Sequence, residues 1–216
     1  MDVNTVFENQ KKAALPDTIE KNYNTRAYSA SIIDINFSVS VITAGPTKSV
    51  LTSNTSAFGG VKVKTVRNDG RISVTDLKTG KRYPSSDAEY DLTDFNRQIG
   101  MAADYNTQAE FDGKLWKLSP IDAANPTLYY SSCEERIVKV SQVVGDTSTI
   151  YTYGYYDESA DFPGAVSSVL IERSQYLRDD SYRDYLKSDS LHTTYEIAVT
   201  SIKKRSALPS KMFDID

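Results

Sequence analysis

The chain contains one histidine and one cysteine, and the surroundings of both argue against nucleophilic catalysis. A serine triad needs an imidazole base beside the nucleophile. His192 instead stands at the start of an expected strand, where a lone histidine is typical of the surface. Cys133 precedes Glu134 and Glu135, whose charges disfavour a reactive thiolate. We therefore expect His192 to be a surface residue and Cys133 to be a buried structural thiol.

Metal and cofactor chemistry has equally little support. Zinc and copper sites draw on several His and Cys ligands at short spacing, which this composition lacks. The fragments nearest to a calcium loop are 68–70 (Asn-Asp-Gly) and 157–161, and both are typical of turns and solvated loops. The sequence lacks the hydrolase motif Gly-x-Ser-x-Gly and the nucleotide-binding motifs Gly-x-x-x-x-Gly-Lys-Ser/Thr and Gly-x-Gly-x-x-Gly. Adjacent acidic residues such as Asp179 and Asp180 are expected by chance and do not indicate a carboxylate pair for catalysis. The sequence predicts no cofactor, no metal and no enzyme; an enzyme using only Asp, Glu, Tyr and Arg is the least supported hypothesis.

Composition limits the partners. The net charge of −4 and the pI of about 5.2 disfavour a nucleic-acid binder, because such a protein needs a basic surface patch. The one basic cluster, 203–205, is expected at a strand end. No run approaches the roughly 18 apolar residues of a membrane span. The start of the chain is not that of a signal peptide. Two localisations stay open: cytoplasmic or host-cell expressed if Met1 is native, and extracytoplasmic if Met1 replaces a removed leader.

Apolar and aromatic residues on strands are the candidates for binding a ligand. In 32–42 apolar residues alternate with Asp34, Asn36, Ser38 and Ser40, which predicts a strand with one buried and one wet face. Tyrosine is abundant, with 15 of 216 residues, and forms a second row together with Trp116. Each set either packs a core or lines a ligand cavity. The candidate ligand-binding residues are Ile33, Ile35, Phe37, Val39, Val41, Trp116, Tyr151 and Tyr153.

These residues need a sheet to position them. We expect an N-terminal helix over about 3–22, a second helix over about 93–104, and a Ser/Thr/Asn-rich connection after Gly45-Pro46. Turns at 68–70, 112–113 and 145–146 predict antiparallel hairpins. Residues 174–190 suit a short helix or an ordered loop, and 194–202 a last strand.

The fold class that follows is mainly β (α+β). Residues 1–216 are expected to form a single domain with a curved antiparallel sheet or open half-barrel of about nine strands, on which two or three helices pack. A two-sheet sandwich is the alternative.

The C-terminal stretch resembles one known family. Residues 195–202 (Tyr-Glu-Ile-Ala-Val-Thr-Ser-Ile), then Leu208-Pro209 and then 212–215 (Met-Phe-Asp-Ile) are similar to the ending of LolA/LolB-like lipoprotein carriers. Residues 112–116 (Asp-Gly-Lys-Leu-Trp) resemble the mid-chain hairpin of that family, and the expected order of elements is similar. The resemblance implies an unclosed half-barrel with helices across its opening, whose concave face would hold acyl chains, and it brings no catalytic residues.

Two functions follow as hypotheses. The first is a non-catalytic carrier or sensor of an apolar, lipid-like ligand. The second is a structural or assembly component of a multi-subunit particle such as a virion, which would work through protein–protein interfaces or as an oligomer.

Overall fold

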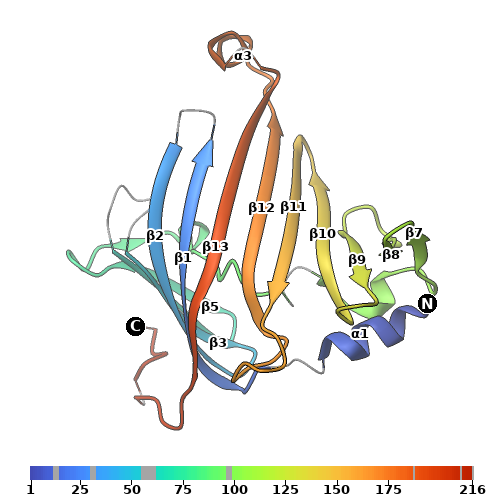
Figure 1. The fold of residues 1–216 in the computed structure, drawn as a ribbon. Helices are drawn as coiled ribbons and strands as arrows, with labels where there is room; N and C mark the ends of the chain where they lie inside the picture. The colour runs from blue at the N-terminus through green and yellow to red at the C-terminus, as the bar shows by residue number, and fades with distance from the viewer. Residues whose placement is uncertain are drawn as a thin grey trace. The chain divides into compact units, whose positions relative to one another are not determined.

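The structure is a computed structural model, and it describes residues 1–11, 15–29, 33–54, 62–95, 99–186, 188–209 and 211–215 (Figure 1). Its strands are β1 (Thr18–Ser29), β2 (Ile33–Ala44), β3 (Lys48–Ser53), β4 (Val63–Asn68), β5 (Arg71–Asp76), β6 (Arg82–Tyr83), β7 (Glu110–Asp112), β8 (Leu115–Leu118), β9 (Thr127–Ser131), β10 (Arg136–Val144), β11 (Thr147–Tyr155), β12 (Val166–Tyr176) and β13 (Ser190–Lys204). The helices that it describes are α1 (Val3–Lys11), α3 (Asp180–Leu186) and the 3-10 helices η1 (Ser85–Asp87) and η2 (Ala102–Asp104).

In the described part of the chain the strands form one open sheet in the order β6-β5-β4-β3-β2-β1-β13-β12-β11-β10-β9-β8-β7. Neighbours in this order are joined by antiparallel pairing wherever their register is defined, for example Val144 opposite Thr147 and Lys48 opposite Asn68. The predicted class, mainly β with an open antiparallel sheet, is confirmed, although 13 strands replace the expected nine or so. The two-sheet sandwich is wrong for these residues, because one sheet contains every strand.

The chain divides into two compact units. Unit 1 consists of Met1–Ala14, Ala27–Asp34 and Thr93–Glu196, and unit 2 of Leu15–Arg26, Ile35–Leu92 and Ile197–Asp216. The strands β1, β2 and β13 contribute residues to both. The expectation of a single domain stays a prediction.

The N-terminal helix is shorter than predicted. α1 ends at Lys11, and Thr18–Ser29 is the strand β1. The apolar residues of β1, Ile19, Tyr23 and Ala27, are spaced by four, which mimics a helix. The strand buries polar residues at the positions between them, and this hides the period of two.

Two further predictions need correction. Residues after Gly45-Pro46 include the strand β3, in which Val50 and Leu51 point to opposite faces and are both buried. The second helix was expected over about 93–104, but residues 96–98 lie outside the described part. Of the expected helix, residues 93–95 are not helical, Ile99 is helical, Gly100 has a φ of 63°, and Ala102–Asp104 form the 3-10 helix η2.

The predicted hairpins are confirmed. Asp69 and Gly70 both have positive φ, 49° and 85°, between β4 and β5. A turn with two left-handed residues matches the twist of the strands that it joins. Gly113 and Gly145 occupy the corresponding turns of β7–β8 and β10–β11.

The C-terminal tail is hydrogen-bonded to the β4–β5 hairpin within unit 2. Asn68 Nδ2 donates a hydrogen bond of 3.1 Å to the carbonyl oxygen of Phe213, and the Arg71 guanidinium donates one of 2.9 Å to that of Ile215. The short helix allowed for 174–190 is α3, which caps the β12–β13 hairpin (Figure 1).

Candidate functional site

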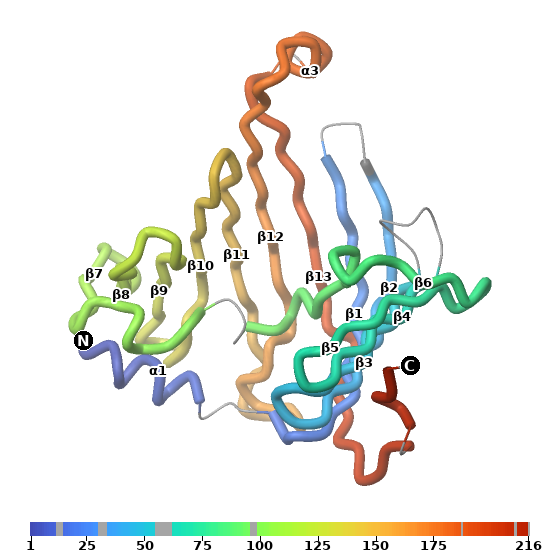
Figure 2. The backbone as a smooth tube through the Cα atoms, turned by 180° about the vertical axis from the view of Figure 1, so that it is seen from behind, coloured from blue at the N-terminus to red at the C-terminus, as the bar shows by residue number. Residues whose placement is uncertain are grey.

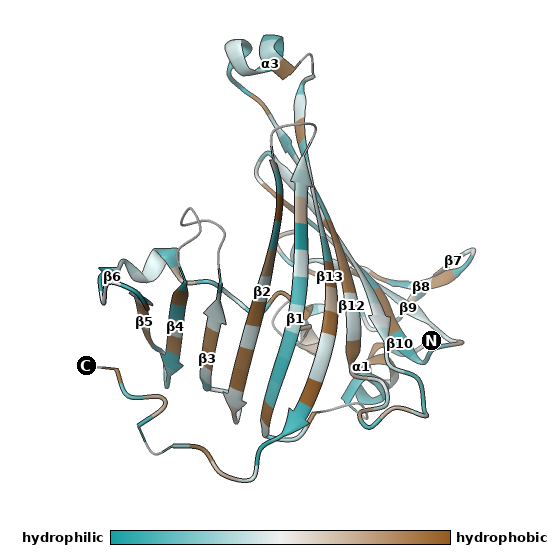
Figure 3. Cartoon of the chain, turned by 60° about the vertical axis from the view of Figure 1, so that its left-hand side comes forward, coloured by the Kyte–Doolittle hydropathy of each residue, from teal (hydrophilic) through white to brown (hydrophobic). Residues whose placement is uncertain are grey.

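The apolar stripe on β2 changes from buried to exposed along the strand. Val41 and Val39 are only 2% and 4% exposed, Phe37 is half-buried, and Ile35 is 40% exposed. These four belong to unit 2 and alternate along one face, a pattern visible as brown bands in Figure 3. Ile33 begins the strand, but its side chain lies outside the described part. The stripe therefore packs a core at one end and loses its cover toward the other.

The segment 84–92 covers the buried end of this face in unit 2 (green in Figure 2). Ala88 packs with Val63 and Val74, which lie on the same face as Val39 and Val41 through the register of β2 to β5. The Arg67 guanidinium donates a hydrogen bond of 2.6 Å to the carbonyl oxygen of Glu89 and lies 4.1 Å from the ring centroid of Tyr90.

A buried ion pair holds the end of the same segment. Lys21 Nζ lies 2.7 Å from Asp91 Oδ2, and the two side chains are only 7% and 13% exposed. The Tyr23 hydroxyl accepts a hydrogen bond of 3.3 Å from the Leu92 N–H. Burial, with the Asp91 carboxylate adding to it, raises the pKa of Tyr23 far above its ordinary value. A cation can stay in this interior position because it is paired there.

Two hydroxyls are also buried in unit 2. Thr25 Oγ1 and Thr65 Oγ1 are inaccessible to solvent and have no hydrogen-bond partner in the part of the chain that the structure describes. Thr65 lies between Leu51 and Val74 in the register of β3, β4 and β5. The face is therefore apolar with isolated polar positions.

In unit 1 the tyrosine row lies along β11. The rings of Tyr151 and Tyr153 are stacked with centroids 6.5 Å apart, and Phe95 meets Tyr153 edge-on at 4.8 Å. Tyr153 is buried and Tyr151 is half-buried. Burial raises the pKa of the Tyr153 phenol well above its ordinary value.

Trp116 is on the same face of unit 1 but not beside this row. It pairs with Tyr130 across β8 and β9, packs at 5.5 Å from Phe111, and donates a hydrogen bond of 2.9 Å from Nε1 to Ser132. Trp116 on β8 and Tyr151 on β11 are separated by the strands β9 and β10. Three spacings of about 4.8 Å between neighbouring strands place the two residues about 14 Å apart across the sheet. The intervening residues of this face are buried: Leu128, Tyr130, Ile137 and Val140.

Helix α1 packs on this face of unit 1. Its residues Val3, Val6 and Phe7 are buried, each burial contributing about 1.5–3 kcal/mol. Asn9 Nδ2 donates a hydrogen bond of 2.8 Å to the Tyr130 hydroxyl. Gln10 Oε1 accepts one of 3.0 Å from the Ile137 N–H, which lies beside the bulge in β10 and needs a partner outside the ladder.

The predicted residues are placed within each unit separately. Phe37, Val39 and Val41 share a face of unit 2, and Tyr151 and Tyr153 share one of unit 1. Sequence reasoning missed Phe95, Arg136 and the Lys21–Asp91 pair. A buried lysine has no sequence signal except its place in the alternation of β1.

Among the described residues, the single histidine, the single cysteine and the acidic side chains form no grouped site. His192 is exposed, as predicted, and Cys133 is exposed in the β9–β10 turn rather than buried, because the turn projects it away from the core. Within the described residues, no three of His, Cys, Asp and Glu are grouped as metal ligands would be. Nor does that part of the chain contain a helix with the length and hydrophobicity to cross a membrane.

Comparisons with known proteins give no match in sequence: no family model matches the chain, and no curated protein does. Solved structures do match over nearly the whole chain. A LolA superfamily protein from Nitrosomonas europaea superposes with a TM-score of 0.59 at 15% identity, covering 100% of this chain and 98% of its own. A domain from Vibrio parahaemolyticus, named for outer membrane lipoprotein sorting, gives 0.57 at 9% identity with 99% and 96% covered.

A third solved structure, a DUF1329 family protein from Desulfovibrio piger, gives a TM-score of 0.60 at 11% identity, covering 98% of this chain and 95% of its own. At these identities the likeness concerns the fold, and it agrees with the family that the C-terminal residues resemble. The chain has a LolA-like fold.

Proposed function

We propose that this protein is a non-catalytic carrier or sensor of an apolar, lipid-like ligand. Two structures with the same fold are named for the LolA superfamily and for outer membrane lipoprotein sorting, which supports a ligand that bears acyl chains. The ligand lies against the apolar faces of the sheet, where apolar side chains are not fully covered by the protein itself.

One observation carries the proposal: the apolar stripe of β2 continues beyond its cover. Val41 and Val39 are buried on the face where Ala88 of the segment 84–92 packs with Val63 and Val74, whereas Phe37 is half-buried and Ile35 is exposed on that face. A strand that only packs a core has no need of apolar residues on the uncovered part of that face. Each fully buried side chain of this size contributes about 1.5–3 kcal/mol, so a ligand that covers both gains appreciable affinity.

The tyrosine row of unit 1 supplies a second apolar face. Tyr151 is half-buried, and Phe95 covers Tyr153. A ligand chain that reaches Tyr153 displaces the Phe95 ring, so Phe95 is the residue of unit 1 whose movement would accompany binding.

The test uses a naphthylamine dye that fluoresces in apolar surroundings. Wild type is expected to bind the dye saturably, and Ile35→Lys is expected to weaken binding about tenfold or more, because it places a charge on the uncovered stripe. Leu77→Lys is the matched control, since Leu77 is 46% exposed in the turn after β5 and outside the stripe. Equal affinities of the two variants would contradict the proposal.

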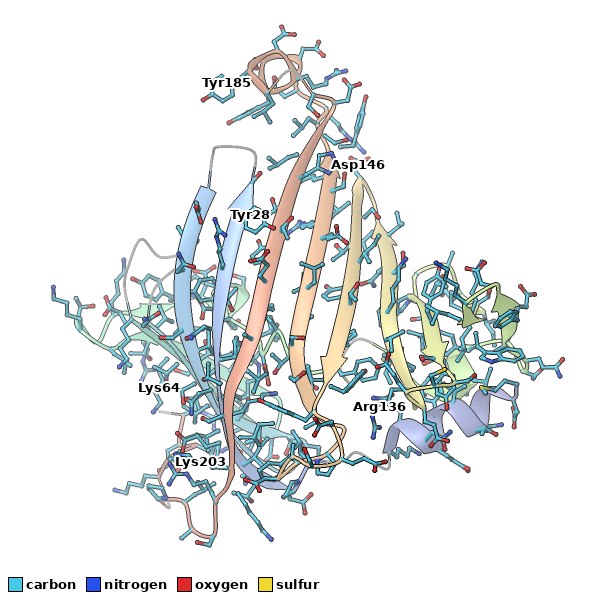
Figure 4. All side chains as sticks on the ribbon, in the orientation of Figure 1. Tyr28, Lys64, Arg136, Asp146, Tyr185 and Lys203 are labelled. Atoms are coloured by element: carbon cyan, nitrogen blue, oxygen red, sulfur yellow. The ribbon has the colours of Figure 1, made fainter. Side chains whose placement is uncertain are left out.

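The alternative, an assembly component, is favoured by one specific observation. Tyr182 and Tyr185 on α3 are 62% and 78% exposed, and tyrosine is enriched in protein interfaces. The labelled side chain of Tyr185 lies at the end of the β12–β13 hairpin in Figure 4. Self-association that Tyr185→Ser abolishes would favour this alternative, whereas a monomer at all concentrations would contradict it.

A further inference from the structure

Arg136 occupies an unusual place in unit 1. It begins β10 opposite Ser131, is half-buried, and its guanidinium carbon lies 5.6 Å from the ring centroid of Tyr155. Figure 4 shows it between α1 and the ends of β10 and β11. Gly164, with a φ of 71°, leaves room for the guanidinium, because a Cβ there would overlap its nitrogen and carbon atoms.

The Nη1 atom of Arg136 is buried and has no hydrogen-bond partner among the described residues. Glu134 and Glu135 are exposed, and the ion pairs found in the described part of the chain do not include Arg136. Five other arginines have a carboxylate or carbonyl acceptor, although Nε of Arg183 is also buried without a partner among the described residues: Arg67, Arg71, Arg178, Arg183 and Arg205. A buried charged donor without an acceptor is costly, so its acceptor is expected from outside the chain.

The polar groups around Arg136 are already engaged with one another. The Tyr155 hydroxyl donates to the Ile137 carbonyl oxygen, and Gln10 Oε1 accepts from the Ile137 N–H. These bonds fix the ring on which the guanidinium stacks and leave the site preorganised for an added acceptor.

We propose that Arg136 binds the acidic head group of an amphiphilic ligand, an inference that rests on the proposed function. A guanidinium holds a carboxylate or phosphate through parallel N–H···O bonds. From Tyr155 the positions of Tyr153 and Tyr151 continue on the same face of β11, about 14 Å along the strand. The head group is therefore held at one end of this row, and the apolar chain extends along it.

The test compares cis-parinaric acid with its methyl ester, two fluorescent ligands that differ only in the charged head. Wild type is expected to bind the acid about tenfold or more tightly than the ester, the ratio for a charge-assisted hydrogen bond. Arg136→Gln is expected to remove this preference and keep ester binding, which also shows that the variant is folded. Arg136→Lys keeps the charge but cannot form two parallel hydrogen bonds. Its preference for the acid over the ester is expected to lie between those of wild type and Arg136→Gln, and it replaces Arg136→Gln in the test if that variant does not fold.

Lys139→Gln is the matched control. Lys139 lies on the same strand, 5.0 Å from the Tyr129 ring centroid and on the opposite face, and its substitution changes the net charge equally. An unchanged preference for the acid in this control supports a local site at Arg136. A loss as large as that of Arg136→Gln would show that the preference comes from long-range electrostatics and would overturn the proposal.

Three further outcomes also decide the matter. Equal binding of acid and ester to wild type overturns the head-group site and leaves the proposed function standing. Binding of neither ligand contradicts the proposed function itself. Millimolar acetate or inorganic phosphate could also displace the acid, but not the ester, from wild type. That result would identify a site for free anions and overturn the proposal of an amphiphilic ligand.

Discussion

The buried ion pair of unit 2 gives a direct test of how the cover over the β2 stripe is held. Asp91→Asn removes the charge opposite Lys21 Nζ, which lies 2.7 Å from the carboxylate with a side chain 7% exposed. Removing one partner of a buried pair costs about 3–5 kcal/mol, because the other charge stays buried. For a chain of this size, the midpoint of thermal unfolding falls by about 2–4 °C per kcal/mol.

The assay is urea unfolding followed by circular dichroism. The exposed pair Lys48–Asp69, 3.7 Å apart, provides the matched control, and Asp69→Asn is expected to cost less than about 1 kcal/mol. The double variant Lys21→Met/Asp91→Leu is expected to recover most of the loss, since neither buried charge remains. A cost below about 1 kcal/mol for Asp91→Asn would refute the burial of the pair.

Three other predictions concern acid, base and one glycine. A hydrogen bond from the Thr79 hydroxyl holds the pKa of Asp76 below its ordinary value of 3.8. The Asp76 carboxylate therefore contributes its full stabilisation above that pH and loses it as the pH falls further. Asp76→Asn should make the free energy of unfolding depend less on pH below about pH 4, and an unchanged pH dependence would contradict this. Burial raises the pKa values of Tyr153 and Tyr155 above 10.0. The contribution of these two phenols to the free energy of unfolding is therefore complete below about pH 10 and decreases above it. An ultraviolet titration should show these phenols ionising only on unfolding, and normal titration of every tyrosine in the folded protein would disprove it. Gly164→Ala should cost about 1–2 kcal/mol in the free energy of unfolding and displace the Arg136 guanidinium, and unaltered stability would show that the site accepts a Cβ.

The sequence predicts this fold best where alternation and turn chemistry agree. Residues 33–41 show a strict period of two and lie in the strand Ile33–Ala44, and Asp69-Gly70 and Asp112-Gly113 mark hairpins that the structure contains. The C-terminal residues resemble the family whose fold the chain has. Local pattern was sufficient in these places, because each strand has one apolar face.

The predictions fail where burial depends on distant partners. β1 buries Lys21 because Asp91, far along the chain, neutralises it, and no local pattern contains that pairing. β3 is buried on both faces, so it lacks the alternation by which a strand is recognised.

The candidate site was predictable only as apolar faces. Phe37 and Tyr151 follow from the alternation of their strands, but their degree of exposure depends on what covers each strand. Arg136 follows from nothing local, since its setting requires Gly164 and Tyr155 to meet it in space.

Native mass spectrometry of the purified protein, followed by organic extraction, tests the central claim most directly. We expect a monomer that carries a stoichiometric ligand, and the extract should contain a molecule with an apolar chain and an acidic head. An oligomer of the bare chain with nothing to extract would contradict the carrier function and favour assembly through protein interfaces.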